Sequence, residues 1–303
     1  KATILNASID AHGEGPGRFC LMKKLLGEAS MDAFGWQVSD AGDVNGDGYA
    51  DFMVGAPCNA AGKVYVFFGG EKLNKVLILK GENNLDEFGD SVSGAGDLNN
   101  DGYDDLIVGA RRYDAIGTDT GRAYVFLGGL TMDSTPDLVL TGESDMDNFG
   151  HEVSDAGDMN NDGYDDFIVS APNNDAGGNW SGRVYIYFGG AVLDSPPDVV
   201  ITGQNIKEYL GRHVSGVGDV QNDGYDDVVI GTNEDVAYLL SGGTSVDNVA
   251  DLEINGEAGS QFNKMNSQPG DLNGDGYDDI IIGASGGLGM GKVEIFYGGQ
   301  NMD

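Results

Sequence analysis

A nine-residue acidic motif occurs five times in this chain of 303 residues and limits its possible folds more than any other feature. The first copy is DVNGDGYAD at 43–51, and the others begin at Asp97, Asp158, Asp219 and Asp271, with spacings of 54, 61, 61 and 52 residues. Five copies at such intervals indicate a repeat protein, in which each unit buries its apolar surface against its neighbours.

Each motif offers oxygen ligands at alternate positions around a glycine, as an EF-hand calcium loop does. An EF-hand also needs a bidentate Glu at its twelfth position, and Val54 occupies that position in the first copy. The helix-loop-helix interpretation therefore fails. We interpret the motif as a calcium loop that joins two strands.

The expected ligands are the side-chain oxygens at positions 1, 3, 5 and 9 and the backbone carbonyl at position 7, because Ca2+ prefers six to eight oxygen ligands. Mg2+ is less suited to such a flexible loop, since it demands octahedral geometry. Gln221 replaces Asn at position 3 of the fourth loop, so we expect this site to be the weakest. The candidate ligands are Asp43, Asn45, Asp47, Tyr49, Asp51, Asp97, Asn99, Asp101, Tyr103, Asp105, Asp158, Asn160, Asp162, Tyr164, Asp166, Asp219, Gln221, Asp223, Tyr225, Asp227, Asp271, Asn273, Asp275, Tyr277 and Asp279.

Up to five Ca2+ ions, one per repeat, are expected to stabilise the fold. If each site has a dissociation constant of about 0.1 to 1 mM, about 1 mM Ca2+ contributes roughly 0.4 to 1.4 kcal/mol per site. Domains are typically stable by about 5 to 15 kcal/mol, so five sites would contribute a substantial part of the free energy of unfolding.

Four loops carry a further acid at position 8, namely Asp104, Asp165, Asp226 and Asp278.

The composition excludes several partners. The formal net charge is -34 with only 16 Lys and Arg, which disfavours nucleic acids and anionic membrane surfaces. The sequence contains no run of 18 apolar residues, so it predicts no membrane-spanning helix. The chain begins at Lys1 without Met or a signal peptide, which is typical of a mature secreted chain or an excised fragment. We therefore expect an extracellular or cell-surface location.

The segments around each loop are typical of strands. They are short, rich in Val, Ile, Phe and Tyr, and bounded by Gly, Pro, Asn and Asp, as in FGWQVSDAGDVNGDGYADFMVGAP followed by GKVYVFFGG and KVLILKGE. Four antiparallel strands per unit, repeated radially, predict an all-β chain that forms a single β-propeller over residues 1–303. The expected blades are about 34–82, 88–143, 149–203, 210–256 and 262–303.

Two details of these strands carry structural expectations. Alternation in KVYVFFGG places Val64, Val66 and Phe68 on one face of the first blade. Glycine pairs follow the third strand of each unit, at 69–70, 128–129, 189–190, 242–243 and 298–299, and would mark the turn out of that strand.

The chain ends predict how the ring closes. The fifth unit lacks a fourth strand, and residues 20–28 align with the fourth strands of other units, so we expect them to close the ring as its outer strand. The rest of the N-terminal segment, 1–19, contains KATILNAS, which resembles a third strand. It is either an extra edge strand or a remnant of a longer propeller.

The two cysteines are expected to remain unbonded to each other. In this arrangement Cys20 and Cys58 lie at opposite faces, roughly 25 Å apart across a strand. A disulfide requires Cα atoms within about 7 Å.

The repeated order of FG, AGDLNGDGYDD and IVGAP resembles the FG-GAP repeats of integrin alpha-subunit propellers and their prokaryotic and secreted relatives. The resemblance covers residues 22–299. It implies a Ca2+-binding propeller with a role in adhesion. Integrin propellers have seven blades, of which only some bind Ca2+, whereas all five units here carry the loop, so the resemblance is to the repeat itself.

An enzyme would need a catalytic constellation that the repeats do not show. His12, His151 and His213 lie in different units, and the regularly spaced acids are already assigned to metal. We therefore expect a non-catalytic protein. A glycoside hydrolase with a dispersed acid pair remains an alternative, since five-bladed propellers include such enzymes.

Ligand recognition is expected on the face opposite the metal loops, where the connecting loops vary in length. Arg111, Arg112 and Tyr113, with Trp180 on the next blade, are candidate ligand-binding residues for a protein or a glycan. The leading alternative to protein adhesion is a lectin-type propeller. The other alternative is that these loop residues bind no ligand and merely offset nearby acids. Asn6 and Asn179 fit the glycan acceptor pattern.

Overall fold

The computed structural model describes residues 3–5, 24–71, 73, 75–233, 235–257, 260, 262, 266–267, 270–286 and 291–300. Strands are the only regular elements in these ranges, which confirms the all-β prediction. None of the described segments forms a helix of the length and apolarity needed to cross a bilayer.

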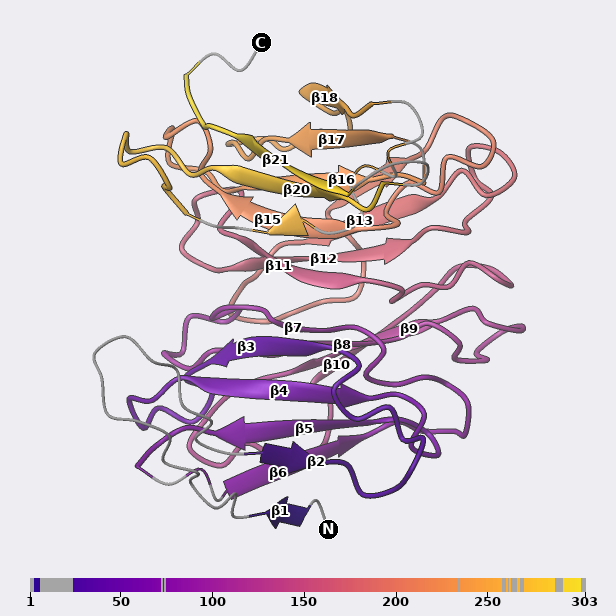
Figure 1. Ribbon diagram of the computed structural model, residues 1–303, viewed down its shortest axis with the longest axis vertical. Helices are drawn as coiled ribbons and strands as arrows, with labels where there is room; N and C mark the ends of the chain where they lie inside the picture. Colours follow the sequence, from indigo (N-terminus) through magenta and orange to yellow (C-terminus); the bar gives the residue numbers. More distant parts are fainter. Residues whose placement is uncertain are drawn as a thin grey trace.

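Apart from a two-stranded N-terminal sheet, the strands form five antiparallel sheets that follow one another along the chain, and we call them blades 1 to 5 (Figure 1). Blade 1 contains β3 (Val38–Gly42), β4 (Asp51–Ala56), β5 (Lys63–Phe68) and β6 (Lys75–Lys80). Blade 2 contains β7 (Val92–Gly94), β8 (Leu106–Ala110), β9 (Arg122–Phe126) and β10 (Leu138–Thr141), and blade 3 contains β11 (Val153–Gly157), β12 (Asp166–Ala171), β13 (Arg183–Tyr187) and β14 (Val199–Thr202). Blade 4 contains β15 (Val214–Gly218), β16 (Asp227–Gly231), β17 (Val236–Leu240) and β18 (Leu252–Asn255), and blade 5 contains β19 (Asn266–Ser267), β20 (Ile280–Ala284) and β21 (Lys292–Phe296).

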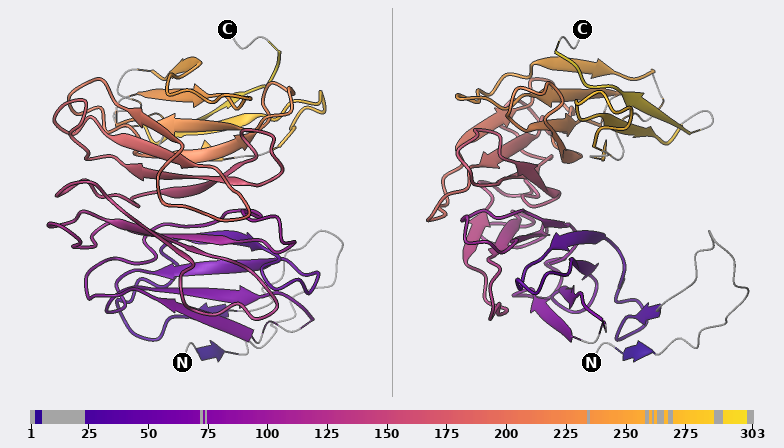
Figure 2. Two further views of the ribbon diagram at one scale, coloured as in Figure 1. Left: turned by 180° about the vertical axis from the view of Figure 1, so that it is seen from behind. Right: turned by 90° about the vertical axis from the view of Figure 1, so that its left-hand side faces the viewer.

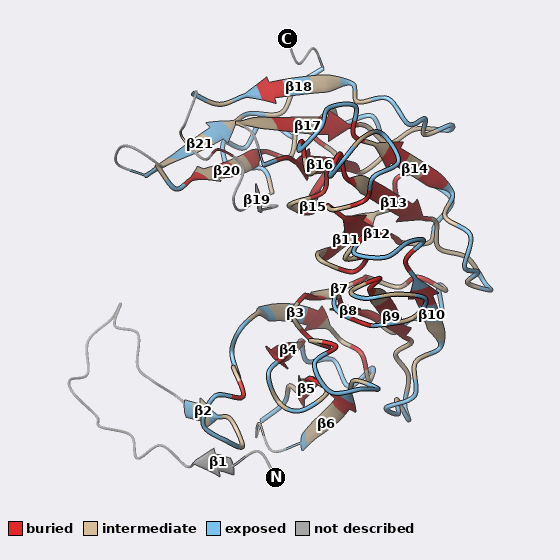
Figure 3. Cartoon of the chain, turned by 90° about the vertical axis from the view of Figure 1, so that its right-hand side faces the viewer, coloured by how far each residue is buried: buried red, intermediate tan, exposed pale blue. Residues whose placement is uncertain are grey.

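The blades are arranged as in a propeller. In blades 1 to 4 each strand pairs with the next one in sequence, and Figure 3 shows the first strands on the inside of an arc and the fourth strands outside. The loops between first and second strands therefore share one face of the molecule with those between third and fourth strands. The remaining loops share the opposite face, which we call the recognition face.

The core lies between neighbouring blades, because the sheets of blades 1 to 4 bury both of their faces. Val64 and Val66 pack in one cluster with Val92 and Val108 of blade 2, as the alternation predicts. The intervening Tyr65 belongs to a different cluster, on the face of blade 1 that is turned away from blade 2. Each blade is thus stable only through its neighbours, as in other repeat proteins.

The structure differs from the predicted ring closure. Within 20–28, β2 (Lys24–Leu26) pairs with β1 (Thr3–Leu5) in a separate two-stranded sheet. This sheet lies beside blade 1, where Leu25 packs against the cluster that contains Tyr65, and the arc is open toward blade 5 (Figure 2). The described part of blade 5 has three strands.

The physical reason is that β2 finds a third strand of its own in the N-terminal segment. β1 pairs with β2 as β5 pairs with β6, and Glu28 after β2 binds Lys63 of blade 1 at 2.5 Å. This matches the longer-propeller interpretation of KATILNAS, because the pair resembles the outer half of a blade preceding blade 1. Cys58 is an exposed thiol without a disulfide, and Cys20 lies outside the described residues.

Candidate functional site

The acidic loops lie at the same end of all five blades, between each first and second strand (Figure 1). In blades 1, 3 and 4 the pairing of these strands shifts register just before the loop, for example between Asp155 and Gly157. Such a bulge bends the strand and directs the following loop. The loops therefore leave the blades in one common geometry.

The first residue of each loop organises its backbone. In blade 3 the Asp158 carboxylate accepts hydrogen bonds from the backbone N–H groups of Asp162 at 3.0 Å and Gly163 at 2.8 Å. The Asp162 carboxylate accepts one from the Tyr164 N–H at 3.1 Å. The same three bonds recur in the other four loops. Each loop is therefore held in shape by hydrogen bonds from its own backbone to its acidic side chains.

The ninth loop residue is a buried carboxylate in every blade. Asp166 accepts the N–H of Gly189 at 2.8 Å and that of Met159 at 2.9 Å, one on each oxygen. Burial raises the pKa of Asp166 to about 8 and that of Asp105 to about 7, and these backbone bonds only partly oppose it. A bound cation would compensate such a buried charge. The five ninth-position acids are Asp51, Asp105, Asp166, Asp227 and Asp279, each at most 1% exposed.

The residues of the loops fit calcium. All their candidate ligand atoms are oxygen atoms of Asp, Asn, Gln and the backbone, which is the set that Ca2+ prefers. In the third loop the side-chain oxygen Oδ1 of Asn160, a predicted ligand, is buried without a hydrogen-bond partner. In the described part of the chain no group of three or more His, Cys, Asp and Glu side chains converges as a metal site. Calcium at these loops thus stays a prediction.

Gln221 behaves differently from its counterparts. Its Nε2 donates to the Ser241 hydroxyl, on the next connection of the same blade. Asn45 and Asn99 instead donate to carboxylates of their own loops. The longer side chain thus points away from the loop. This geometry is the reason why the sequence predicts a weaker site at the fourth loop.

The acids at position 8 join one blade to the blade before it. Asp165 of blade 3 accepts the N–H of Asp97, the first residue of the blade 2 loop, at 2.7 Å. The corresponding pairs are Asp104 with Asp43, Asp226 with Asp158 and Asp278 with Asp219. The first loop has Ala50 at this position. We missed this role in the sequence, although the single alanine was a signal for it.

Glycines allow the blades to approach this closely. Gly157 has a φ of 63°, and a Cβ on it would lie 2.2 Å from a carboxylate oxygen of Asp226. In blades 2 to 5 the second glycine of each pair adds a further contact; for example, the Gly190 N–H donates to the Leu98 carbonyl of the preceding loop at 2.8 Å. The five loops are therefore linked in series rather than standing alone.

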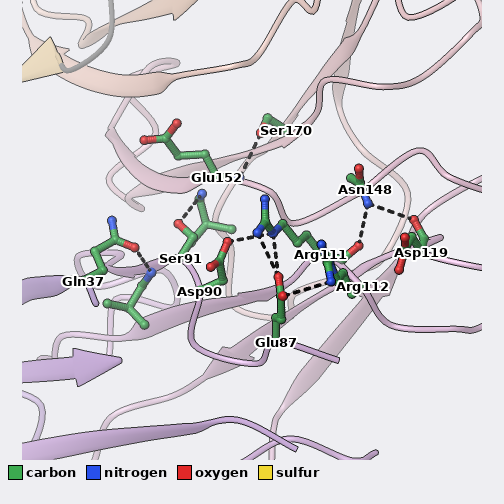
Figure 4. A network of polar contacts seen from close by, with 12 residues as sticks. Gln37, Glu87, Asp90, Ser91, Arg111, Arg112, Asp119, Asn148, Glu152 and Ser170 are labelled. Carbon is green, nitrogen blue, oxygen red and sulfur yellow. Dashed lines mark hydrogen bonds and ion pairs between the residues drawn. The ribbon is translucent and has the colours of Figure 1, made fainter. Parts of the chain in front are cut away.

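On the recognition face, the predicted ligand-binding residues do not form one cluster. Figure 4 shows Arg111 between Glu87 and Asp90, each 2.9 Å away, and Arg112 3.3 Å from Glu87. These two arginines are thus engaged with acids of their own blade. Burial also raises the pKa of Asp90 to about 6, against the effect of Arg111.

Tyr113 is 9% exposed, and its ring lies 3.8 Å from the guanidinium carbon of Arg122. Its hydroxyl group donates to Glu82 at 3.2 Å. A ring so covered offers little surface to a ligand. The prediction that Tyr113 contributes to a binding surface therefore has no support in this geometry.

Trp180 forms a separate exposed group with residues that the sequence did not suggest. Its ring stacks on Tyr209 with centroids 5.8 Å apart, and the Lys207 Nζ lies 5.7 Å from its centroid. Trp180 is 37% exposed, and Asn179 beside it is exposed as well. Within the described part of the chain, no hydrogen bond, ring contact or cation–π contact joins Trp180 to Arg111, Arg112 or Tyr113. Asn6 and His12 lie outside the described residues.

Comparison with known proteins agrees with this architecture. The FG-GAP repeat family matches residues 34–67, 88–126, 152–187 and 267–297. Integrin alpha-5 of Xenopus laevis is 37% identical over 210 residues, which are 65% of this chain and 20% of that protein. Integrin alpha-8 of Mus musculus is 30% identical over 231 residues, 70% of this chain and 21% of that protein. Integrin alpha-6 of Homo sapiens is 34% identical over 196 residues, 62% of this chain and 16% of that protein.

The chain thus spans about a fifth of the length of the curated relatives that it matches. The repeats that match are those of blades 1, 2, 3 and 5, while blade 4 has Leu210 where the FG motif has Phe. The chain is an integrin-like propeller built from FG-GAP repeats.

Proposed function

We propose that this chain is a calcium-stabilised, non-catalytic propeller that binds a ligand in cell adhesion, outside the cell or at its surface. One observation carries the proposal: the five acidic loops are linked in series on one face, which leaves the variable loops together on the other. A rigid scaffold with variable loops is where recognition usually occurs. The similarity to integrin alpha subunits supports a protein ligand.

Calcium is proposed to act on stability rather than on ligand contact. Asp43, Asp97, Asp158, Asp219 and Asp271 are each bonded to the backbone of their own loop. When bound, Ca2+ would neutralise the carboxylates that crowd these loops and hold the linked blades in place. It would not face a ligand on the recognition face.

A thermal melt tests this role directly. The midpoint should be several degrees higher in 1 mM Ca2+ than in chelator, because a contribution of roughly 2 to 7 kcal/mol is expected from five sites. Mg2+ at the same concentration should restore much less. An unchanged midpoint would remove calcium from the proposal while leaving the recognition face to be tested.

The ligand is tested separately. Immobilised chain should be probed with labelled extracellular matrix proteins and with a glycan array, both in Ca2+ and in chelator. Binding to a matrix protein, lost in chelator together with the fold, supports adhesion. Absence of binding in both formats contradicts it.

Binding to glycans alone would instead favour the lectin alternative. The stacked pair of Trp180 and Tyr209 gives this alternative a specific site, since exposed aromatic rings can pack against sugar rings. Trp180→Ala should then abolish glycan binding. Ile116→Ala is a matched control on the recognition face, because Ile116 is exposed and lies in the corresponding loop of blade 2.

A further inference from the structure

A cavity of about 330 Å³ lies at the junction of blades 3 and 4. Its walls are mostly apolar, with Ile201, Leu210, Ile230 and Leu240 among them, and its polar lining residues include Glu208 and Tyr238. An apolar cavity with a few convergent polar groups is the usual form of a small-molecule site. Neither the acidic loops nor the Trp180 group contributes to this lining.

The cavity differs in its walls, rather than in its size, from the corresponding hollow at the junction of blades 2 and 3, which measures about 320 Å³. At that junction Phe149 packs edge-on against Tyr185 with centroids 5.2 Å apart, and Tyr187 follows on the same strand. The corresponding residues at the junction of blades 3 and 4 are Leu210 in place of Phe149 and Leu240 in place of Tyr187. Aliphatic side chains therefore replace aromatic rings in two walls of this cavity.

The rim of this junction also lacks an ion pair that recurs elsewhere. At the other junctions a glutamate after a fourth strand binds a Lys or Arg that begins the next third strand. These pairs are Glu28 with Lys63, Glu82 with Arg122, Glu143 with Arg183 and Glu257 with Lys292. At the junction of blades 3 and 4 the two positions hold Gln204 and Val236. The entrance is therefore uncharged, while the interior keeps its carboxylate.

Glu208 is the buried charge of the cavity, with 4% of its surface exposed. Its Oε2 accepts the N–H groups of Gln204 and Asn205 at 2.8 Å, and its Oε1 accepts the Tyr238 hydroxyl at 3.2 Å. A carboxylate oxygen can accept two hydrogen bonds, so Oε1 can take a further donor. Among the described residues no Lys or Arg forms an ion pair with Glu208. The equivalent acids Asp86 and Asp147 are also buried and accept backbone N–H groups of the same turn, but Asp147 does not line the corresponding hollow. Glu208 is longer by one methylene and lines the cavity, where its Oε1 can accept a hydrogen bond from a cationic donor.

We propose that the cavity between blades 3 and 4 binds a small organic molecule with an apolar body and one protonated amine, which donates to Glu208. The apolar body packs against Leu210 and Leu240, where the neighbouring junction has aromatic walls. The uncharged rim lets a cation enter without competition from an arginine or lysine. This site is additional to the proposed recognition face, and it can exist whether or not that face binds a protein.

Calorimetric titration tests the site with 2-phenylethylamine as the probe and 2-phenylethanol as its neutral counterpart, both in 1 mM Ca2+. The amine should bind more tightly than the alcohol. Glu208→Gln should weaken the amine about tenfold or more, since a bond to a charged group contributes about 1.5 to 3 kcal/mol. It should change the alcohol little. Glu143→Gln makes the same substitution at the neighbouring junction and should leave both affinities unchanged.

A second variant keeps the test valid if Glu208→Gln does not fold. Leu210→Phe combined with Leu240→Phe places two larger rings in the cavity walls and should occupy much of the space that a ligand would use. Binding of both probes should then be lost while the thermal midpoint is maintained. The proposal is overturned if the wild-type chain does not bind the amine, or if the filled variant binds it as well as the wild type does.

Discussion

The carboxylate of Asp165 accepts the backbone N–H of Asp97 at 2.7 Å, across the junction between blades 3 and 2. The two residues are 68 positions apart in the chain, yet both belong to acidic loops. Through this contact, a loop belongs to the interface between two neighbouring blades as well as to its own sheet. Stability of one loop is therefore coupled to that of its neighbour.

Replacing Asp165 with alanine should reveal this coupling. Asp165→Ala copies the natural Ala50 of the first loop, and it should lower the free energy of unfolding by about 1.5 to 3 kcal/mol, the usual contribution of a bond to a charged group. Urea denaturation measures the loss. Asp194→Ala, an exposed acid elsewhere in blade 3, should change stability by less than about 0.5 kcal/mol. Equal effects of the two substitutions would contradict a specific tie.

The glycine that faces such a tie should not tolerate a side chain. Gly157→Ala forces a Cβ to within 2.2 Å of the Asp226 carboxylate and keeps a φ of 63°, so we expect a loss of about 2 to 4 kcal/mol. Gly190→Ala is the matched control, because a Cβ there meets only the Val192 carbonyl at 3.8 Å. Thermal and urea denaturation should rank the two variants clearly, and a mild Gly157→Ala would mean that the blades can separate at little cost.

The fourth loop should gain calcium affinity when its third residue is restored. Gln221→Asn removes the methylene that lets this side chain reach Ser241, and it should strengthen Ca2+ binding at this loop by up to about tenfold, or about 1.4 kcal/mol. The amide resonance of Gly224, whose N–H binds Asp219, reports on this loop during a Ca2+ titration. Gly163 reports on the third loop and should respond as in the wild type. A fourth loop no weaker than the third in the wild-type chain would refute the ranking.

His151 should make the fold sensitive to mild acid. Burial, followed by the charges of Arg111, Arg212 and His213, lowers the pKa of His151 to about 3, and its Nδ1 has no partner. The unfolded chain protonates this residue below its ordinary value of about 6.5, whereas the folded chain does not. The unfolded state therefore binds more protons between about pH 3 and 6.5, and stability falls as pH falls through this range.

His151→Gln removes this proton uptake while keeping a polar side chain. Between pH 7.5 and pH 5, wild type should lose about 2 kcal/mol more of its unfolding free energy than the variant does. Urea denaturation at both pH values in constant Ca2+ gives the difference. Identical losses in the two proteins would show that His151 is accessible to protons in the folded state.

The sequence predicted the blades and strands because their signals are local. Alternating residues such as Val64 and Val66 face one side of a strand regardless of what lies beyond it. The acidic loop repeats with every blade, so its place between the first two strands could be read from a single copy. Ring closure depended instead on which partner β2 would choose, and an equally suitable third strand lay nearer in the chain.

Side-chain partners on the recognition face could not be read from the sequence. Arg111 and Trp180 occur in corresponding loops, but the acids Glu87 and Asp90 come from another connection and hold Arg111 in place. The partner of Trp180, Tyr209, belongs to the connection that leads into blade 4. Contacts between such loops depend on the arrangement of whole blades, which a repeat alignment does not contain.

Ala50 gives the arc a direction. Every later loop reaches back to the one before it, and Ala50 has no carboxylate with which to do so. A stack held by nearest-neighbour contacts behaves as a one-dimensional cooperative system, in which a unit with one neighbour is less stable than a unit with two. Unfolding should therefore begin at the ends of the arc and proceed inward, with blade 3, which lies farthest from both ends, as the last part to lose its structure.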